Sequence, residues 1–398
     1  MVKHLFLLGV FLLIGISSFS QWIAQTSGST NELHSIYFID INNGYAVGEY
    51  GTVLKTTNGG STWTTKISGT AKMLNSVFFI NANVGFAVGE HGCIIKTTDG
   101  GTSWTVLNSG TTKGLHSVFF TDVNTGYAVG DTLTILKTTN GGTSWTSQSS
   151  GTTANELYSV YFTDSNNGIA VGGYFSLQTI LKTTNGGSTW NSISTGSNYW
   201  LFSVHFINST TGYACGKNGL VMKTTNSGNT WTTLTTGTSN YLYSIFFVNA
   251  STGYAVGSGG MIIKTTNGGT SWTVQSSNTT NDLDDIYCVT ATTCFISGWH
   301  GTILKTSNGG IGVPLNPLPN SSISIYPNPT SDKIMIENKL KTPKETAVQI
   351  FTLLGKSVYE QHYYFKNPIL LDFNLPKGIY FIKIQTDDGY FIQKLMVE

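Results

Sequence analysis

The stretch that decides the fold is LKTTNGGSTW at residues 54–63. It returns six times with small changes, and its lysine recurs at Lys96, Lys137, Lys182, Lys223, Lys264 and Lys305. Successive lysines are 41, 41, 45, 41, 41 and 41 residues apart. A fixed period of this length is the signature of a repeat architecture, in which each unit buries its hydrophobic face against its neighbours.

Each repeat contains four short runs with the composition of β-strands. In the first repeat, the runs LHSIYF and GYAVG begin at Leu33 and Gly44, and two more flank Trp63. Four strands in a repeat of this length are typical of one blade of a β-propeller. The sequence therefore predicts an all-β fold whose main body, residues 21–312, is a seven-bladed β-propeller.

The two ends of the repeat array complement each other. The seventh repeat loses its Trp and the strand after it, and continues as IGVP at residues 311–314. The missing pieces stand at the start of the array, where Trp22 and the residues after it match Trp63 and its strand. We expect this N-terminal strand to complete the seventh blade, which closes the ring without an open joint.

Composition argues against several classes of function. All 21 basic residues are Lys, so no guanidinium fork is present to clamp a carboxylate or phosphate. The formal net charge is +1 and the chain has no basic run, so we expect no nucleic-acid partner.

Residues 1–20 have the features of a secretory signal peptide: Lys3 near the start, an apolar run, and a small-x-small cleavage site at residues 18–20. The apolar run of about a dozen residues is too short for the roughly 20 that span a bilayer, and no second long run follows. We therefore expect an exported protein without a transmembrane segment.

The four cysteines predict one cross-link and no metal site. Cys288 and Cys294 flank a turn-like stretch, so they are predicted to form a disulfide across a hairpin in an oxidising compartment. Cys93 and Cys215 lie in apolar strand patterns and are expected to be buried thiols. None of the four has metal-ligand spacing, and we expect neither a metal nor a cofactor.

The turn of each repeat, residues 56–63 in the first, resembles the Asp-box, [Ser/Thr]-x-[Asp/Asn]-x-Gly-x-[Ser/Thr]-Trp. With the GYAVG strand, the whole unit resembles the propellers of the photosystem II assembly-factor family. It is more distantly similar to sialidases, sortilin-type receptors and Asp-box xyloglucanases. Among the Trp-bearing copies the Asx position is Asn except at Asp99, so we interpret the box as a turn device and not as a set of acid catalysts.

A Pro-rich linker at residues 313–322 leads to a second domain at 323–398, whose alternating runs predict a small Ig-like β-sandwich. This domain resembles the type A C-terminal sorting domain of the Bacteroidetes type IX secretion system. The residues that carry the resemblance include Tyr326, Pro327, Asn328, Pro329, Gly378, Tyr380 and Lys394. The resemblance implies an address for the outer-membrane translocon and removal by a sorting peptidase, with the cargo released or attached to the cell surface. The alternative is an Ig-like accessory domain that stays attached.

The functional face is predicted from positions that differ between blades while the scaffold repeats. These positions precede the first strand or follow the second strand of a blade, and both loops lie on one face of a propeller. Trp200 and Trp299, the two Trp outside the repeat register, belong to this set. The binding candidates are Tyr50, His91, Tyr174, Phe175, Tyr199, Trp200, Tyr241, Trp299 and His300. Such aromatic side chains stack on sugar rings or grip a peptide, or else they merely cover the blade ends.

Acidic residues on the same loops leave an enzyme as the alternative. Glu49, Glu90, Asp131 and Asp282 are the carboxylates that a glycoside hydrolase would need. Sialidase is excluded because the arginine triad of that family has no counterpart. His34 and His116 are expected to pack locally, and one recurring position, occupied by Ser in six blades and by Asp285 in the seventh, is expected to line the axial channel.

The sequence thus favours a monomeric, non-enzymatic propeller at the outer-membrane surface or outside the cell, which binds a glycan or protein ligand through its variable face. The alternative is a secreted glycoside hydrolase. A third possibility, an assembly factor for a membrane complex, follows from the family resemblance.

Overall fold

The computed structural model describes residues 22–152, 156–175, 177–309, 323–338, 345–352, 357–364, 368–386 and 389–398. The expected signal peptide and the linker at 313–322 lie outside the described residues. The chain divides into two compact units, Met1–Ile311 and Gly312–Glu398, and each is described by itself.

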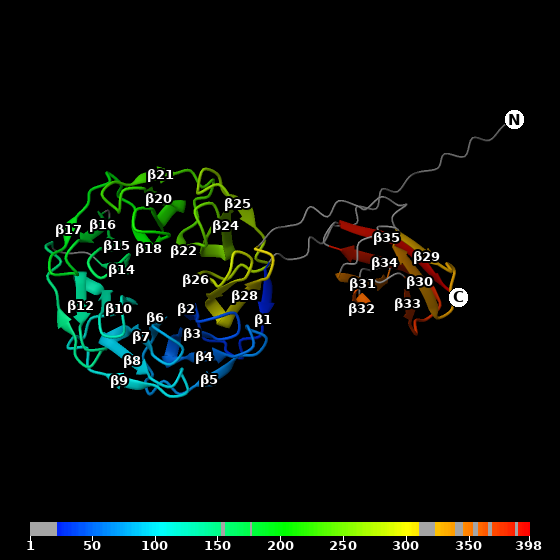
Figure 1. The fold of residues 1–398 in the computed structure, drawn as a ribbon, viewed down its shortest axis with the longest axis horizontal. Helices are drawn as coiled ribbons and strands as arrows, with labels where there is room; N and C mark the ends of the chain where they lie inside the picture. Colours follow the sequence, from blue (N-terminus) through cyan, green and yellow to red (C-terminus); the bar gives the residue numbers. More distant parts are fainter. Residues whose placement is uncertain are drawn as a thin grey trace. The chain divides into compact units, whose positions relative to one another are not determined.

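The first unit is a ring of seven four-stranded antiparallel sheets, which confirms the predicted propeller (Figure 1). Blades 1 to 3 comprise β2 (Leu33–Phe38), β3 (Gly44–Gly48), β4 (Val53–Thr56) and β5 (Thr64–Lys66); β6 (Leu74–Phe79), β7 (Gly85–Gly89), β8 (Cys93–Thr97) and β9 (Thr105–Leu107); and β10 (Leu115–Phe120), β11 (Gly126–Gly130), β12 (Thr134–Thr138) and β13 (Thr146–Ser147). Blades 4 to 6 comprise β14 (Leu157–Phe162), β15 (Gly168–Tyr174), β16 (Leu177–Thr183) and β17 (Asn191–Ser192); β18 (Leu201–Phe206), β19 (Gly212–Gly216), β20 (Val221–Thr224) and β21 (Thr232–Leu234); and β22 (Leu242–Phe247), β23 (Gly253–Gly257), β24 (Met261–Thr265) and β25 (Thr273–Gln275).

The seventh blade is closed by the N-terminal strand, as predicted. Its strands are β26 (Leu283–Cys288), β27 (Cys294–Gly298), β28 (Thr302–Thr306) and β1 (Ile23–Gln25). β1 pairs antiparallel with β28, with Ile23 opposite Lys305. Trp22, only 1% exposed, packs in the cluster between blades 6 and 7. The ring is therefore held shut by main-chain hydrogen bonds between the two ends of the propeller.

The Asp-box residues hold the turn between the third and fourth strands. In blade 1, the Asn58 side chain accepts a hydrogen bond from the Thr62 N–H at 2.9 Å, and the Thr56 hydroxyl accepts one from the Gly60 N–H at 3.0 Å. In blade 2, hydrogen bonds from Ser103 lower the pKa of the exposed Asp99 carboxyl. Asp99 therefore stays ionised and is unsuited to donate a proton.

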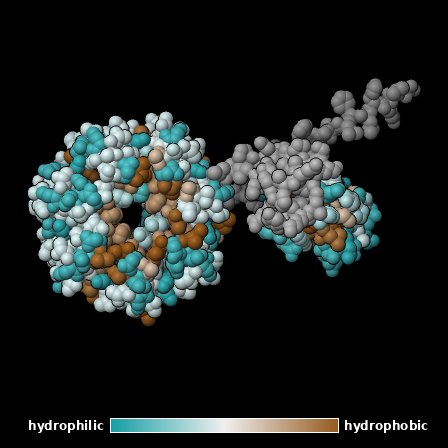
Figure 2. Space-filling model, viewed as in Figure 1, coloured by the Kyte–Doolittle hydropathy of each residue, from teal (hydrophilic) through white to brown (hydrophobic). Residues whose placement is uncertain are grey.

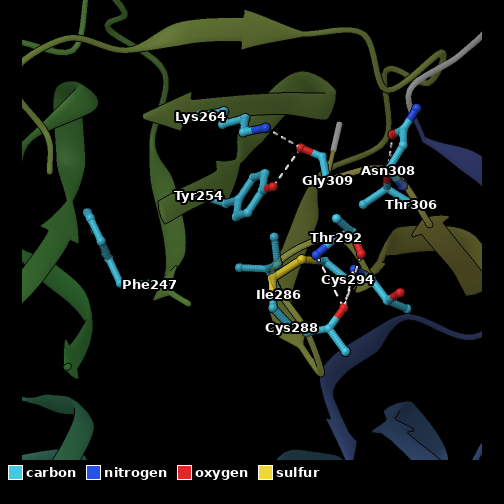
Figure 3. Close-up of a disulfide and its surroundings, with 12 residues drawn as sticks. Phe247, Tyr254, Lys264, Ile286, Cys288, Thr292, Cys294, Thr306, Asn308 and Gly309 are labelled. Carbon is cyan, nitrogen blue, oxygen red and sulfur yellow. Dashed lines mark hydrogen bonds between the residues drawn. A yellow bond between two sulfur atoms is a disulfide. The ribbon is translucent and has the colours of Figure 1, made fainter. Parts of the chain in front are cut away.

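The repeated lysine joins each blade to the turn of the next. Its ammonium group donates to a Gly carbonyl of the following blade at 2.5–3.1 Å in six blades, and to the Asn229 side chain in blade 4. Figure 3 shows one case, in which Lys264 and the Tyr254 hydroxyl both donate to the Gly309 carbonyl. Seven of the propeller's lysines are therefore bound on the face that carries the Asp-box turns.

A second ring of contacts joins the inner strands. The hydroxyl of Ser35, which is 6% exposed, accepts a hydrogen bond from the Val77 N–H of the next blade at 3.3 Å. The same bond recurs at the five next junctions, and at the last one the Asp285 carboxylate accepts from the Ile36 N–H at 3.0 Å. The recurring position therefore has a structural role between blades.

Blade 7 contains the disulfide, which joins Cys288 and Cys294 across the β26–β27 hairpin (Figure 3). The other six blades have Phe and Gly at these two positions, and the Phe ring covers the Gly so closely that a Cβ on Gly44 would lie 2.4 Å from Phe38. The disulfide therefore occupies the space that a Phe–Gly pair fills elsewhere in the ring.

The second unit consists of two sheets that enclose one hydrophobic core. One sheet has the order β29 (Ile323–Tyr326), β30 (Lys333–Asn338), β33 (Ile369–Asp372), and the other β32 (Ser357–Tyr364), β31 (Glu345–Thr352), β34 (Gly378–Thr386), β35 (Gly389–Val397). Asn328 links the start of this unit to its last strand, because its side chain donates to the Lys394 carbonyl at 2.6 Å and accepts from the Met396 N–H at 2.9 Å. The Tyr380 hydroxyl donates to the Pro376 carbonyl at 2.9 Å.

Candidate functional site

The variable positions meet on one face of the propeller, here called the loop face. In six blades the N–H that follows the second strand, and in blade 4 the equivalent N–H inside that strand, donates to the carbonyl of the residue that precedes the first strand, at 2.9–3.0 Å. The donor–acceptor pairs are Glu49–Glu32, Glu90–Met73, Asp131–Gly114, Gly173–Glu156, Lys217–Trp200, Ser258–Tyr241 and Trp299–Asp282. In each blade, this hydrogen bond therefore holds the residue before the first strand beside the residue after the second strand or, in blade 4, beside its equivalent.

The turn after the second strand constrains its middle residue. In six blades this turn is a three-residue 3-10 segment: η1 (Glu49–Gly51), η2 (Glu90–Gly92), η3 (Asp131–Leu133), η4 (Lys217–Gly219), η5 (Ser258–Gly260) and η6 (Trp299–Gly301). The middle residue is left-handed, with φ between 50° and 66°, and among the six only blade 6 has Gly there. Tyr50, His91 and His300 hold this strained conformation while their side chains are exposed, which suggests that the side chains themselves are needed.

Blades 2 and 3 bring two carboxylates together. A Cβ on Gly114 would lie 2.7 Å from Asp131 Oδ2 and 3.2 Å from Glu90 Oε2, so both oxygens occupy the space that a side chain would fill. Asp131 also accepts hydrogen bonds from the Gly114 N–H at 2.9 Å and contacts His116 Nε2 at 2.7 Å. Hydrogen bonds within blade 3 therefore hold the Asp131 carboxylate in place. The Glu90 carboxylate of blade 2 lies beside it, over Gly114.

Blades 7 and 1 form a second acidic cluster. His34 Nδ1 lies 2.9 Å from Asp284 Oδ2. Burial opposes the charged form of His34, but the hydrogen bond and charge of Asp284 outweigh it and raise the His34 pKa. Burial and the nearby Glu49 carboxylate raise the Glu32 pKa, and burial raises the Asp284 pKa. Asp282 accepts hydrogen bonds from the Tyr243 hydroxyl at 3.1 Å and the Gly259 N–H at 2.8 Å. Together with the Glu90 and Asp131 carboxylates, these residues form the acidic sector of the loop face, which spans blades 7, 1, 2 and 3.

Blade 4 departs from the other six. Its second and third strands continue past the usual turn, with Tyr174 opposite Leu177, so a β-hairpin replaces the 3-10 segment. The hairpin is tied to the following loop, because the Trp200 indole N–H donates to the Phe175 carbonyl at 2.6 Å and the Gln178 amide donates to the Tyr199 carbonyl at 3.0 Å. Four apolar side chains remain exposed and form the hairpin patch: Tyr174 (41%), Phe175 (74%), Leu177 (60%) and Tyr199 (46%).

Trp200 and Tyr241 are partly covered by a cation of the chain itself. The Lys217 ammonium lies 5.1 Å from the Trp200 ring centroid and 5.7 Å from that of Tyr241. Together with the bond from its indole N–H, this contact makes Trp200 a support for the surface more than an open platform. Trp299 is 39% exposed, near His300 in blade 7.

Behind the loop face runs the central channel, visible as the opening in Figure 2. Deeper in the channel, seven side chains form a closed ring whose neighbouring centroids lie 4.4–5.4 Å apart: Tyr37, Phe78, Phe119, Tyr161, His205, Phe246 and Tyr287. Burial lowers the pKa of His205 to about 4, so this ring is uncharged at neutral pH. This aromatic ring therefore contributes no charge to the site.

Two family models match the chain. Residues 324–398 match the secretion system C-terminal sorting domain. Residues 15–113 and 148–239 match photosynthesis system II assembly factor YCF48. The propeller is therefore similar to YCF48, and the second unit to the type IX sorting domain. The sorting domain implies handling by the type IX secretion system and a location at the cell surface or outside the cell.

Solved structures agree on the fold of the YCF48-like propeller. YCF48 bound to a D1 peptide is 20% identical, with a TM-score of 0.62, over 73% of this chain and 96% of that chain. YCF48 from Cyanidioschyzon merolae is 20% identical, with a TM-score of 0.61, over 72% and 98%. The WD40 β-propeller domain of Doa1 is 15% identical, with a TM-score of 0.60, over 72% and 97%. No curated protein matches the chain in sequence.

The described part of the chain has no group of three or more His, Cys, Asp or Glu side chains placed to hold a metal ion. Within the same residues, no helix has the length and apolar character needed to cross a membrane.

Three residues of the loop face were not among the binding candidates predicted from the sequence. Leu177 and Gln178 lie in the four-residue insertion of the fourth repeat, and that insertion was the available signal. Lys217 stands at a variable position, but its contact with two rings depends on the spacing between blades 5 and 6, which the sequence does not state.

Proposed function

We propose that this exported propeller is a non-enzymatic, monomeric binding protein whose loop face holds a protein ligand. The hairpin patch carries the proposal. It exposes one aliphatic and three aromatic side chains on the hairpin and the following loop, which hydrogen bonds tie together, and rigid aromatic anchors are what protein interfaces use.

A protein ligand is favoured over a glycan by the chemistry of this patch. A sugar site needs an open aromatic platform with polar groups around it, whereas Trp200 is partly covered by Lys217 and has its indole N–H already bonded. Leu177 and Phe175, at the tip, offer apolar contact and no hydrogen bond from their side chains. A YCF48 propeller of the same fold has been solved with a D1 peptide bound, which agrees with a peptide-binding role for such a ring.

Delivery is assigned to the C-terminal domain. We propose that the translocon of the type IX system recognises residues 323–398 and that a sorting peptidase then removes them, leaving the propeller as the mature protein. Mass spectrometry of the exported protein tests this step, because a surface-exposed form that retains Glu398 would contradict it.

The binding function is tested with a peptide library and a glycan array, each probed with the wild-type protein and with the double variant Phe175→Ser and Leu177→Ser. Peptide binding that the double variant loses supports the proposal. Glycan binding without peptide binding overturns it.

A glycoside hydrolase remains the second candidate, because the Glu90 and Asp131 carboxylates converge over Gly114. Paired carboxylates at short range are what retaining glycosidases use. Release of reducing sugar from a polysaccharide panel by the wild-type protein, abolished by Glu90→Gln, would establish this candidate in place of the binding protein. Three of the four acids, Glu49, Asp131 and Asp282, accept hydrogen bonds from backbone N–H groups of their own face, which favours a structural or binding role.

A further inference from the structure

We infer that the protein ligand of the loop face is a basic segment, an extended stretch of chain that lays apolar side chains on the hairpin patch and Lys or Arg side chains over the acidic sector. This inference rests on the proposed function.

The hairpin patch is preorganised for contact. The Trp200 indole and the Gln178 amide hold the hairpin and the following loop together at 2.6 and 3.0 Å, so the patch does not have to order itself when a ligand arrives. Phe175, the most exposed of its four residues at 74%, is also held in a left-handed conformation with φ of 51°. An apolar side chain that is strained and exposed at once is best explained by a partner that covers it.

The charge of the loop face determines which charge its partner should carry. Seven carboxylates belong to its loops and upper inner strands, and three lysines oppose them. The carboxylates are Glu32, Glu49, Glu90, Asp131, Glu156, Asp282 and Asp284, and the lysines are Lys72, Lys113 and Lys217. Seven of the propeller's 11 lysines are bound to the Asp-box turns on the opposite face. A nearly neutral chain therefore presents a negative loop face, which attracts cationic segments.

The acidic sector and the hairpin patch are continuous. The His116 ring, which contacts Asp131, lies 5.3 Å from the Tyr158 ring of blade 4. The Tyr158 hydroxyl donates to Glu156, and the Gly173 N–H at the base of the hairpin donates to the Glu156 carbonyl at 3.0 Å. A single extended segment that crosses from blade 3 to blade 4 meets carboxylates first and apolar side chains next.

The test selects peptides from a random library displayed on phage, with the full chain as target and without any assumed ligand. Selected peptides are expected to be enriched in Lys or Arg together with aromatic or aliphatic residues. Their affinity is expected to fall at least about tenfold in the variant Phe175→Ser with Leu177→Ser, as truncation of hot-spot residues does. It is expected to fall with rising salt and in the variant Glu49→Gln with Glu90→Gln.

The matched control truncates exposed apolar residues of the opposite face, Ile41→Ser with Val123→Ser, and is expected to bind the peptides as the wild type does. Peptides that bind the hairpin patch but are acidic or neutral would overturn the inference while leaving the proposed function intact. Selection of no peptide, or of peptides that the Phe175 and Leu177 variant still binds, would overturn both.

Discussion

Asp285 gives the propeller a pH dependence that can be worked out from its contacts. It is the residue that replaces Ser at the seventh junction of the inner ring. Its carboxylate accepts hydrogen bonds from the Ile36 N–H at 3.0 Å, the Ser35 hydroxyl at 3.0 Å and the Ser244 hydroxyl at 2.8 Å. Burial outweighs these bonds and raises the Asp285 pKa from 3.8 to about 6.

The sign and size of the effect follow from this pKa. Between pH 3.8 and 6, the folded state keeps a proton on Asp285 that the unfolded chain has lost, so stability falls as pH rises through this window. A difference of about two pH units corresponds to about 3 kcal/mol, at 1.36 kcal/mol per unit. Asp285 should therefore lower the free energy of unfolding by about this amount between pH 4 and pH 7.

The variant Asp285→Ser has the residue of the other six blades and lacks this pH-dependent contribution to the free energy of unfolding. Urea unfolding of the full chain at pH 4 and pH 7 measures it, and tryptophan fluorescence reports the propeller alone because all nine Trp lie between residues 22 and 299. The other titrating groups are common to both proteins, so they cancel in the comparison. Equal changes of unfolding free energy with pH in the wild type and the variant would show that the Asp285 pKa is not raised in the folded state.

Three further predictions concern the repeat. Ser227 has φ of 60° where the other repeats have Gly, so Ser227→Gly should raise the free energy of unfolding by about 1 kcal/mol in a urea titration, and a loss would contradict this. Cys288→Ser should lower the free energy of unfolding by about 2 kcal/mol. The double variant Cys288→Phe with Cys294→Gly should recover much of that loss and make unfolding insensitive to dithiothreitol. A double variant that is still sensitive would show that a Phe–Gly pair does not replace the disulfide. Tyr50→Gly should stabilise the propeller by about 1 kcal/mol while weakening ligand binding, and a stabilised variant with unchanged binding would exclude Tyr50 from the site.

The fold followed from the sequence because a propeller is built from local signals repeated at one period. The strand runs, the Asp-box turn and the position of Trp22 each needed only comparison between repeats. The Cys288–Cys294 pair was readable from its spacing in the same way, since both residues belong to one hairpin.

The contacts between blades could not be predicted by comparing the repeats. The bond from Lys55 to the Gly100 carbonyl of the next blade, and the exchange of a Phe–Gly pair for a disulfide, depend on which atoms of neighbouring repeats meet in space. The site shows the same limit: variation between repeats located the loop face, but only the structure distinguishes Trp200, a partly covered support, from Phe175, an exposed tip.

Photo-crosslinking tests whether the loop face binds protein. A photoreactive amino acid is placed at Phe175 in the full chain, and in a parallel protein at Val123 on the opposite face, and both are irradiated in cells that export them. We expect a crosslinked protein adduct at position 175 that is missing at position 123. Adducts of equal yield at both positions, or none at 175, would contradict it.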